Sequence, residues 1–326
     1  MNTSENFLHS TEAIRDQIEL RLRKLIPESP QSLYDPIRYI LESGGKHIRP
    51  VLSFLASRSN QSADWLPAGC AVELLHNFTL VHDDIMDNAK SRRGNPTMHN
   101  KYDVNTAILA GDAIIALADE SLASGKYTFA SEMMSEFAFA FRSVCEGQAY
   151  DKEFEMRNDV TTEDYIRMID LKSAKMLELA AVLGAYSAGG ENVEAVRRFA
   201  HHTGIAFQIR DDLLDLVADE SSFGKTQGGD ISEGKRTYLF VTAMESFDSL
   251  NEPDQALLMR IQGKQTVAHD IAHAKKLFAE LGVLQKAEQA ISIQTMTAKR
   301  SLENIHSSEV RDGLTAFGEY LLGREY

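Results

Sequence analysis

Proline and cysteine are both scarce in this chain of 326 residues. Only Pro253 of the 7 prolines lies beyond Pro96. Because proline breaks helices, and because apolar residues recur at helical spacing along the chain, this proline-poor body predicts an all-α fold. The 2 cysteines, Cys70 and Cys145, are too few for a disulfide framework and are typical of a reducing cytoplasm. Both lie in helical patterns, where we expect them to be buried.

Basic residues are also in the minority. The chain has 34 Lys and Arg against 48 Asp and Glu, a net charge of −14. Nucleic-acid-binding proteins need a basic stripe, so this balance argues against a nucleic-acid partner. No run of 18 or more apolar residues occurs, which predicts no transmembrane helix and no stable membrane insertion. Residues 1–7 lack the basic and apolar regions of a signal peptide, so the expected location is cytoplasmic.

Helical spacing of apolar residues covers most of the chain, and no stretch has the alternation of a strand. We expect helices at residues 5–25, 33–43, after Pro50, and at 65–87, 103–123, 127–150, 162–186 and 191–218, with more helices over 237–325. The helix at 65–87 is apolar nearly all round, which is typical of a central, buried helix. Because no linker or internal repeat interrupts the pattern, the sequence predicts a single domain over residues 1–326.

Three carboxylates, Asp83, Asp84 and Asp87, follow the apolar part of the helix at 65–87. Asp83 and Asp87 are four residues apart, so on a helix they share one face at a spacing of roughly 5–6 Å. Mg²⁺ binds one or two carboxylates together with substrate phosphates, and this pair suits it. Taken alone, the motif is equally consistent with an acidic helix end exposed to solvent.

A second Asp-Asp-x-x-Asp motif, Asp211, Asp212 and Asp215, ends the helix at 191–218. It repeats the pair of carboxylates four residues apart at the end of another apolar helix. Helical bundles build metal sites from side chains on facing helices. Two such motifs therefore indicate a site for several divalent cations, and two solvated helix ends in the same arrangement are a much weaker explanation.

Basic residues accompany both acidic motifs. Gly44 and Gly45 form a turn before Lys46 and Arg49, in which glycine allows close approach and the two cations suit phosphate oxygens. The spacing is not that of a P-loop. The remaining basic residues near the motifs are Arg92, Arg93, Lys172, Lys225 and Lys235. Singly, each is most simply a solvated surface charge, but together they predict a bound metal–polyphosphate.

Several motifs in a fixed order now point to one family. They are Gly44-Gly-Lys-x-x-Arg-Pro50, the two aspartate motifs, Arg92-Arg-Gly94, and Gly224-Lys-x-x-Gly-x-Asp230. With them the chain resembles the trans-isoprenyl diphosphate synthases, or polyprenyl synthetases, over nearly its whole length. The resemblance implies one helical bundle around a deep central cavity, usually a homodimer. It also implies an enzyme that condenses isopentenyl diphosphate with an allylic diphosphate, using three Mg²⁺ ions.

The resemblance also implies roles for individual residues. The metal ligands would be Asp83, Asp84, Asp87, Asp151, Asp211, Asp212 and Asp215. The groups that bind the allylic diphosphate would be Arg92, Gln148, Lys172, Lys225 and Lys235, and those that bind isopentenyl diphosphate would be Lys46, Arg49, His76 and Arg93. Ser173 and Gln208 would face the allylic cation. The family usually has Thr where Ser173 stands, and the hydroxyl is kept. We expect His82 to be structural.

Product length is indicated by the residues just before the first motif. Phe78 is the fifth residue before Asp83, and Thr79 is the fourth. A bulky side chain here would form the floor of a funnel between helices, and an aromatic at the fifth position resembles the short-chain synthases. With small Thr79 beside it, we favour geranylgeranyl diphosphate as the product, with farnesyl or longer products as the alternative. Phe78 as an ordinary core residue also stays open.

Two other functions deserve comparison. A class I terpene cyclase also ionises a diphosphate at an aspartate motif, but it needs no second diphosphate site, so Lys46 and Arg49 argue against it. A non-catalytic subunit that tunes a partner synthase is a further possibility. Such subunits tend to lose their aspartate motifs, and this chain keeps both.

Overall fold

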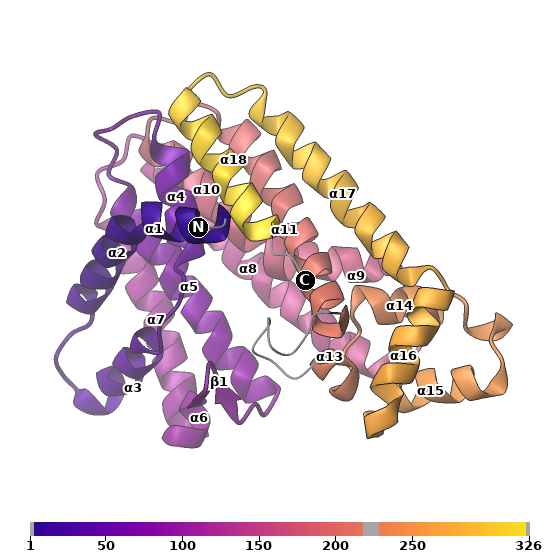
Figure 1. Cartoon of the computed structure of the whole chain (residues 1–326). Helices are drawn as coiled ribbons and strands as arrows, with labels where there is room; N and C mark the ends of the chain where they lie inside the picture. Colours follow the sequence, from indigo (N-terminus) through magenta and orange to yellow (C-terminus); the bar gives the residue numbers. More distant parts are fainter. Residues whose placement is uncertain (1–2, 218–227, 324–326) are drawn as a thin grey trace. The chain divides into compact units, whose positions relative to one another are not determined.

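The computed structural model describes residues 3–217 and 228–323, and it is built almost entirely of helices (Figure 1). In the described part, strands are limited to β1 (Ser91–Arg92) and β2 (Asn95–Pro96), which pair antiparallel. The all-α prediction is confirmed. None of the described helices is long and apolar enough to cross a membrane.

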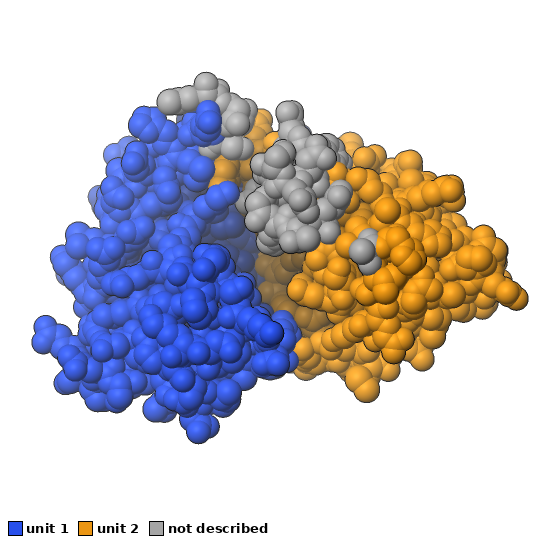
Figure 2. Space-filling view, turned by 60° about the horizontal axis from the view of Figure 1, so that its bottom comes forward, with its two compact units in different colours: residues 1–141, 176–198, 301–317 blue, residues 142–175, 199–300, 318–326 orange. Residues whose placement is uncertain are grey.

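The chain divides into two compact units, coloured separately in Figure 2. Unit 1 comprises residues 1–141, 176–198 and 301–317, and unit 2 comprises residues 142–175, 199–300 and 318–326. Each unit is therefore assembled from three separate segments of sequence. The single domain expected from the sequence stays a prediction.

Unit 1 is organised around α5 (Trp65–Met86), which packs against α4 (Ile48–Ser57) and α7 (Val104–Ala123). Its other elements are α1 (Thr3–Ser10), α2 (Glu12–Leu25), α3 (Gln31–Glu42), α6 (Met98–Lys101), residues 130–141 of α8 (Ala130–Met156), and most of α10 (Lys175–Ser187). Ala68, Val72 and Leu75 of α5 are inaccessible to solvent. The expected burial of this helix is confirmed, because apolar residues on all its sides meet other helices.

Unit 2 has its own apolar core, formed by residues such as Phe154, Ile209, Phe240, Leu257 and Phe278. Its elements include residues 142–156 of α8, α9 (Thr162–Ile169), the π-helix η1 (Asp170–Ala174), residues 199–217 of α11 (Val193–Val217), α13 (Gly229–Ser232), α14 (Tyr238–Met244), η2 (Phe247–Ser249), α15 (Glu252–Gln262), α16 (Ala268–Glu280) and most of α17 (Val283–Leu302). The last helix, α18 (Ser308–Leu322), has residues in both units.

Local differences from the expected elements have physical causes. The first helix is interrupted at Thr11, whose ψ of 5° departs from helical geometry and whose hydroxyl donates to the Phe7 carbonyl. The expected helix at 162–186 contains a π-helical turn, which apolar spacing does not reveal. Cys70 is buried as expected, but Cys145 is exposed, so that expectation was wrong. On α8 its neighbours Val144 and Gly147 face inward, which leaves Cys145 on the solvent side.

Candidate functional site

The first aspartate motif lies at the C-terminal end of α5. Asp83 is half-buried, Asp84 is buried with 2% exposure, and Asp87 is the exposed C-cap. The Asp87 backbone N–H donates to the Asp83 carbonyl at 2.8 Å, so the helical turn that joins them is intact. Asp83 and Asp87 therefore share a face, as predicted from their spacing.

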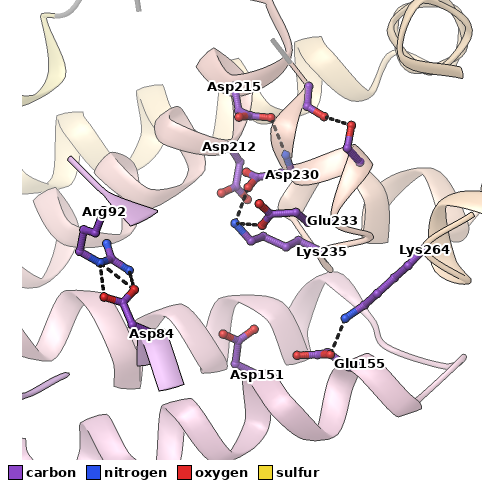
Figure 3. A network of polar contacts seen from close by, with 12 residues as sticks. Asp84, Arg92, Asp151, Glu155, Asp212, Asp215, Asp230, Glu233, Lys235 and Lys264 are labelled. Atoms are coloured by element: carbon purple, nitrogen blue, oxygen red, sulfur yellow. Dashed lines mark hydrogen bonds and ion pairs between the residues drawn. The ribbon is translucent and has the colours of Figure 1, made fainter. Parts of the chain in front are cut away.

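Asp84 is engaged by Arg92 of β1 (Figure 3). The Arg92 Nε lies 2.9 and 3.0 Å from the two Asp84 carboxylate oxygens, and its Nη2 is 2.7 Å from Oδ1. A forked contact of this kind is the strongest geometry available to an Arg–carboxylate pair. The structure thus places a predicted metal ligand and a predicted diphosphate-binding residue in direct contact within unit 1.

Arg49, His76 and Arg93, three of the residues predicted to bind isopentenyl diphosphate, lie close together within unit 1. Burial is the main cause that holds the pKa of His76 well below its ordinary value. The positive charges of Arg49 and Arg93 lower it further. The imidazole is therefore neutral and lies among cations. Burial also lowers the pKa of Arg49 to about 10. Lys46 is exposed just before them in the chain. This cluster of Lys46, Arg49, His76 and Arg93, the basic cluster, has the charge expected of an anion site.

The proposed chain-length residue Phe78 sits in an aromatic group in unit 1. Its ring is edge-on to His82, with centroids 4.4 Å apart, and edge-on to Phe141 at 5.2 Å. His82 in turn presses against Gly111 of α7, where an added Cβ would lie 2.7 Å from Nε2. The Thr79 hydroxyl donates to the His76 carbonyl at 2.7 Å. Phe78 is therefore held in place by packing, and His82 has the structural role expected of it.

The second aspartate motif, on α11 in unit 2, has a different arrangement. Asp212 is buried with 6% exposure and accepts three hydrogen bonds: from the Tyr165 hydroxyl at 2.5 Å, the Tyr238 backbone N–H at 2.8 Å and the Gln208 amide at 3.2 Å. Burial and the nearby charge of Asp230 raise the pKa of Asp212 to about 7, although these hydrogen bonds act in the opposite direction. Both of its oxygens are thus committed to contacts within the fold.

Asp215 anchors the segment that begins at Gly228. Its carboxylate accepts a hydrogen bond from the Asp230 backbone N–H at 3.0 Å, and its carbonyl accepts one from Gly228 at 2.8 Å. Lys235 lies 2.8 Å from Asp230 and 2.9 Å from Glu233 (Figure 3). Burial acts to lower the pKa of Lys235, but these carboxylates raise it well above its ordinary value. Lys235 is therefore a permanent cation in the vicinity of this motif.

Lys172 belongs to the π-helical turn η1 and pairs with Asp151 of α8, with Nζ 2.6 Å from Oδ2. An added Cβ at Gly147 of α8 would lie 2.6 Å from the Lys172 backbone nitrogen. Glycine at this position is thus required for the close approach of α8 to η1. π-Helical turns of this kind are frequent at functional sites.

Ser173 and Gln208, predicted to face the same cation, are hydrogen-bonded to each other. The Ser173 hydroxyl donates to the Gln208 carbonyl oxygen at 2.9 Å, and the Gln208 amide donates to Asp212. An added Cβ at Gly204 would lie 2.6 Å from the Ala174 Cα, which explains how α11 approaches η1 so closely. Gln148 is buried on α8. Lys225 lies outside the described residues.

The donor chemistry of the two motifs can be compared with the needs of Mg²⁺. Among residues 3–217 and 228–323, no three His, Cys, Asp or Glu side chains already form a cluster that could hold a metal ion. Mg²⁺ needs only one or two carboxylates when substrate phosphates and waters supply its other ligands. Asp83 with Asp87, and Asp211, provide carboxylates of this kind, so the residues present fit the ion.

Three residues of these sites were missed by sequence reasoning. Tyr165 holds Asp212, and no local pattern connects two residues 47 positions apart. Asp230 belongs to a recognised motif, but its pairing with Lys235 was not foreseen. Glu73, which pairs with His47, could have been found: it is a lone carboxylate on an apolar helix, three residues before His76.

Comparison with known proteins agrees with the motifs. Residues 30–281 match the model of the polyprenyl synthetase family. The short chain isoprenyl diphosphate synthase of Methanothermobacter thermautotrophicus is 36% identical over 312 residues, which cover 94% of this chain and 95% of that protein. The geranylgeranyl diphosphate synthase of Methanosarcina mazei is 33% identical over 317 residues, which cover 95% of each chain.

A solved structure shows the same architecture. The crystal structure of geranylgeranyl pyrophosphate synthetase from Pyrococcus horikoshii aligns with a TM-score of 0.91 at 33% sequence identity. The alignment covers 98% of this chain and 99% of that one. The similarity in fold therefore extends well beyond the motif-bearing segments.

Proposed function

Because the chain belongs to the polyprenyl synthetase family, we propose that it is a Mg²⁺-dependent trans-prenyltransferase. It condenses isopentenyl diphosphate with an allylic diphosphate to give a short-chain all-trans prenyl diphosphate. The names of the relatives and the preserved motifs support this proposal. The residues with proposed roles are those predicted from the sequence, except that we propose that Asp84 orients Arg92, and that Asp212 holds Tyr165, Tyr238 and Gln208, in place of a metal ion.

One observation carries the proposal in preference to a diphosphate-ionising cyclase. The basic cluster surrounds a neutral His76 with cations, and its four residues include no carboxylate. Such a surface suits a diphosphate that stays intact throughout the reaction, as that of isopentenyl diphosphate does. A cyclase acts on a single diphosphate and has no use for this second anion site.

The first chemical step is cleavage of the allylic C–O bond, whose electron pair leaves with the diphosphate. Mg²⁺ held by the aspartate motifs would supply Lewis-acid stabilisation of this developing charge. The protein's own cations act in the same sense: Lys172 held by Asp151, Arg92 held by Asp84, and Lys235 held by Asp230. Because each is already oriented by a carboxylate, little reorganisation is needed when the charge develops.

Ser173 and Gln208 would stabilise the allylic cation. The Ser173 hydroxyl proton is directed toward Gln208, which leaves the oxygen lone pairs of Ser173 available to a positive carbon. The double bond of isopentenyl diphosphate then forms the new C–C bond. A proton leaves the resulting cation for an oxygen of the released diphosphate, which restores a double bond and balances charge.

The proposed main product is geranylgeranyl diphosphate. The aromatic group of Phe78, His82 and Phe141 supports a floor that limits chain growth, since each ring is held by another. Small Thr79 leaves more depth than a second aromatic residue would. Farnesyl diphosphate and longer products are the alternatives that product analysis would separate.

A homodimer and a cytoplasmic location complete the proposal. Unit 1 exposes several apolar side chains on α7 and α8: Val104, Ile108, Leu109, Met134 and Phe139. The Leu109 side chain is 59% exposed. Contact between this much apolar surface and water is unfavourable, so the surface suits an interface covered by a second chain. Both cysteines are free, as expected in a reducing compartment. Light scattering of the native chain and of Leu109→Glu would test the dimer, since the charge should shift it toward the monomer.

The experiment that tests the function is product analysis. The protein is incubated with labelled isopentenyl diphosphate, Mg²⁺ and each allylic primer in turn, and the products are sized by chromatography. We expect chains with a 20-carbon main product, and no turnover after chelation of Mg²⁺ until the ion is restored. Release of inorganic diphosphate with cyclic hydrocarbons, and no incorporation of the label, would show a cyclase instead.

A further inference from the structure

His47 has an unusual backbone conformation in the middle of the motif that carries Lys46 and Arg49. Its φ and ψ are 44° and 39°, in the left-handed region that residues with a side chain seldom adopt. It occupies the N-cap of α4, yet its side chain makes no capping hydrogen bond. Some other contact must therefore hold the residue in this conformation.

That contact is with Glu73 of α5. His47 Nδ1 lies 2.9 Å from Glu73 Oε1, and both residues are buried, with 6% and 5% exposure. His47 Nε2 also lies 3.6 Å from Glu19 of α2. Both ring nitrogens thus face carboxylates, and only the protonated imidazolium can donate to both.

Glu73 is also the counter-charge of the basic cluster. Burial acts to raise the pKa of Glu73, but the hydrogen bond from His47 and the charges of His47 and Arg49 hold it below its ordinary value. Glu73 is three residues before His76 and so lies on the same side of α5. Glu73 thereby contacts His47 in the turn and also lies next to the basic cluster.

The outer side of the turn is held by Arg93. Its Nη1 donates to the Gly44 carbonyl, and an added Cβ at Gly45 would lie 3.1 Å from the same nitrogen. The turn is thus fixed from two sides: His47 anchors it to the core of unit 1, and Arg93 lies over its glycines. Both contacts confine the backbone that carries Lys46.

We infer that the buried His47–Glu73 pair is a positioning device that holds Lys46 and Arg49 in register to bind the diphosphate of the non-allylic substrate. The inference rests on the proposed function of the basic cluster. Neither His47 nor Glu73 contacts substrate: they act through the backbone between residues 46 and 49. Loss of the pair should therefore weaken binding of isopentenyl diphosphate and leave the allylic diphosphate and the chemical step largely unaffected.

The pair also implies a pH dependence. Burial acts to lower the pKa of His47, but Glu73 and Glu19 together raise it above its ordinary value of about 6.5. The titratable and charged groups that face the pair are Glu19 on α2, Arg49 on α4, the neutral His76 on α5, and Arg93. Because the folded state favours the protonated form, the pair is fully formed below about pH 6.5 and is lost as pH rises through the raised pKa. The KM for isopentenyl diphosphate should rise over that alkaline range.

The test compares Glu73→Gln, His47→Gln and His47→Arg by steady-state kinetics with each substrate varied in turn. For both Gln variants we expect the KM for isopentenyl diphosphate to rise about tenfold or more, because a hydrogen bond between charged groups is lost. The kcat and the KM for the allylic diphosphate should stay within about threefold of native. His47→Arg keeps its charge at all pH values, so it should restore binding and remove the alkaline rise in KM.

Two controls separate the inference from its premise. Lys46→Ala tests the proposed site itself: if it affects both substrates equally, the assignment of the basic cluster fails. If Lys46→Ala is selective for isopentenyl diphosphate and both Gln variants bind it normally, only the positioning inference fails. His273→Gln removes a comparable His–carboxylate pair, Nε2 to Asp254 Oδ1 at 2.7 Å in unit 2, and should leave both KM values unchanged.

The variant His47→Arg, which keeps the positive charge, separates a loss of positioning from a folding defect. Should Glu73→Gln or His47→Gln fail to fold, the pH profile of His47→Arg still decides the matter. The inference is supported if the KM for isopentenyl diphosphate rises at alkaline pH in the native enzyme but does not change with pH in His47→Arg. An alkaline rise of equal size in both proteins overturns it, because the rise could not then come from His47.

Discussion

In α5 the middle aspartate of the motif faces an arginine, whereas in α11 the middle aspartate faces a tyrosine hydroxyl, a backbone amide and a glutamine side chain. Both motifs read Asp-Asp-x-x-Asp. Asp84 is compensated by the charge of Arg92, whose side chain is 34% exposed. Asp212 is satisfied by neutral donors inside unit 2, and its pKa is raised to about 7.

The difference teaches that one sequence pattern can have two arrangements. In unit 1 the middle carboxylate orients the Arg92 guanidinium, a proposed binder of the diphosphate. In unit 2 it organises the structure around Gln208 and Tyr238, and it depends on Tyr165. The first aspartate of each motif keeps its proposed role as a metal ligand. Four experiments would break or sharpen this comparison.

The largest effect is expected where the two motifs should behave alike. Asp83→Ala and Asp211→Ala should each reduce kcat by about 10³-fold or more, because each removes a proposed Mg²⁺ ligand at the leaving group. Circular dichroism should show an intact fold for both variants. Turnover within tenfold of native in either variant would refute the metal assignment for that motif.

The substitution Arg92→Lys tests the Arg92–Asp84 pair in unit 1. Lysine keeps the charge that compensates buried Asp84 but loses the fork that holds both of its oxygens. We expect kcat to fall about tenfold to hundredfold, since one oriented donor to the leaving group is lost. Thermal unfolding should be nearly unchanged. A large loss of stability with normal kcat would mean that this pair, too, is mainly structural.

Tyr165→Phe is the matched change in unit 2. It removes the hydroxyl that donates to Asp212 at 2.5 Å and leaves a buried acceptor short of a partner. The free energy of unfolding, measured in urea, should fall by about 1–3 kcal/mol. The effect on kcat should be smaller than that of Arg92→Lys. The reverse order of effects would contradict the division of roles drawn between the two motifs.

The smallest change in rate is expected for Phe78→Ala, which acts on product length. Removal of the ring would open the proposed floor, so the products should lengthen by about one or more five-carbon units while kcat stays within tenfold. His82→Ala serves as the control: it leaves the Phe78 ring in place and removes only one of its supports, so its shift should be smaller. An unchanged product profile in Phe78→Ala would leave Phe78 as a core residue.

Much of the fold followed from local patterns. Helical spacing of apolar residues predicted nearly every long helix and the burial of α5, because a helix that is apolar on all sides must meet partners on all sides. The interruption at Thr11 and the π-helical turn at Asp170–Ala174 were not predictable from that spacing. The first coincides with the hydrogen bond from the Thr11 hydroxyl to the Phe7 carbonyl, and the second with close helix packing at Gly147 and Gly204; apolar periodicity encodes neither.

Residue types and their spacing along the chain were enough to establish the family, the two carboxylate motifs and the basic residues near them, since these are properties of neighbouring positions on a helix or turn. The tertiary structure alone assigned each of these groups its partner: Arg92 to Asp84, Lys172 to Asp151, Tyr165 to Asp212 and Glu73 to His47. The physical reason is that ion pairs and pKa values depend on distance and burial in space, and these depend on residues far apart in the chain.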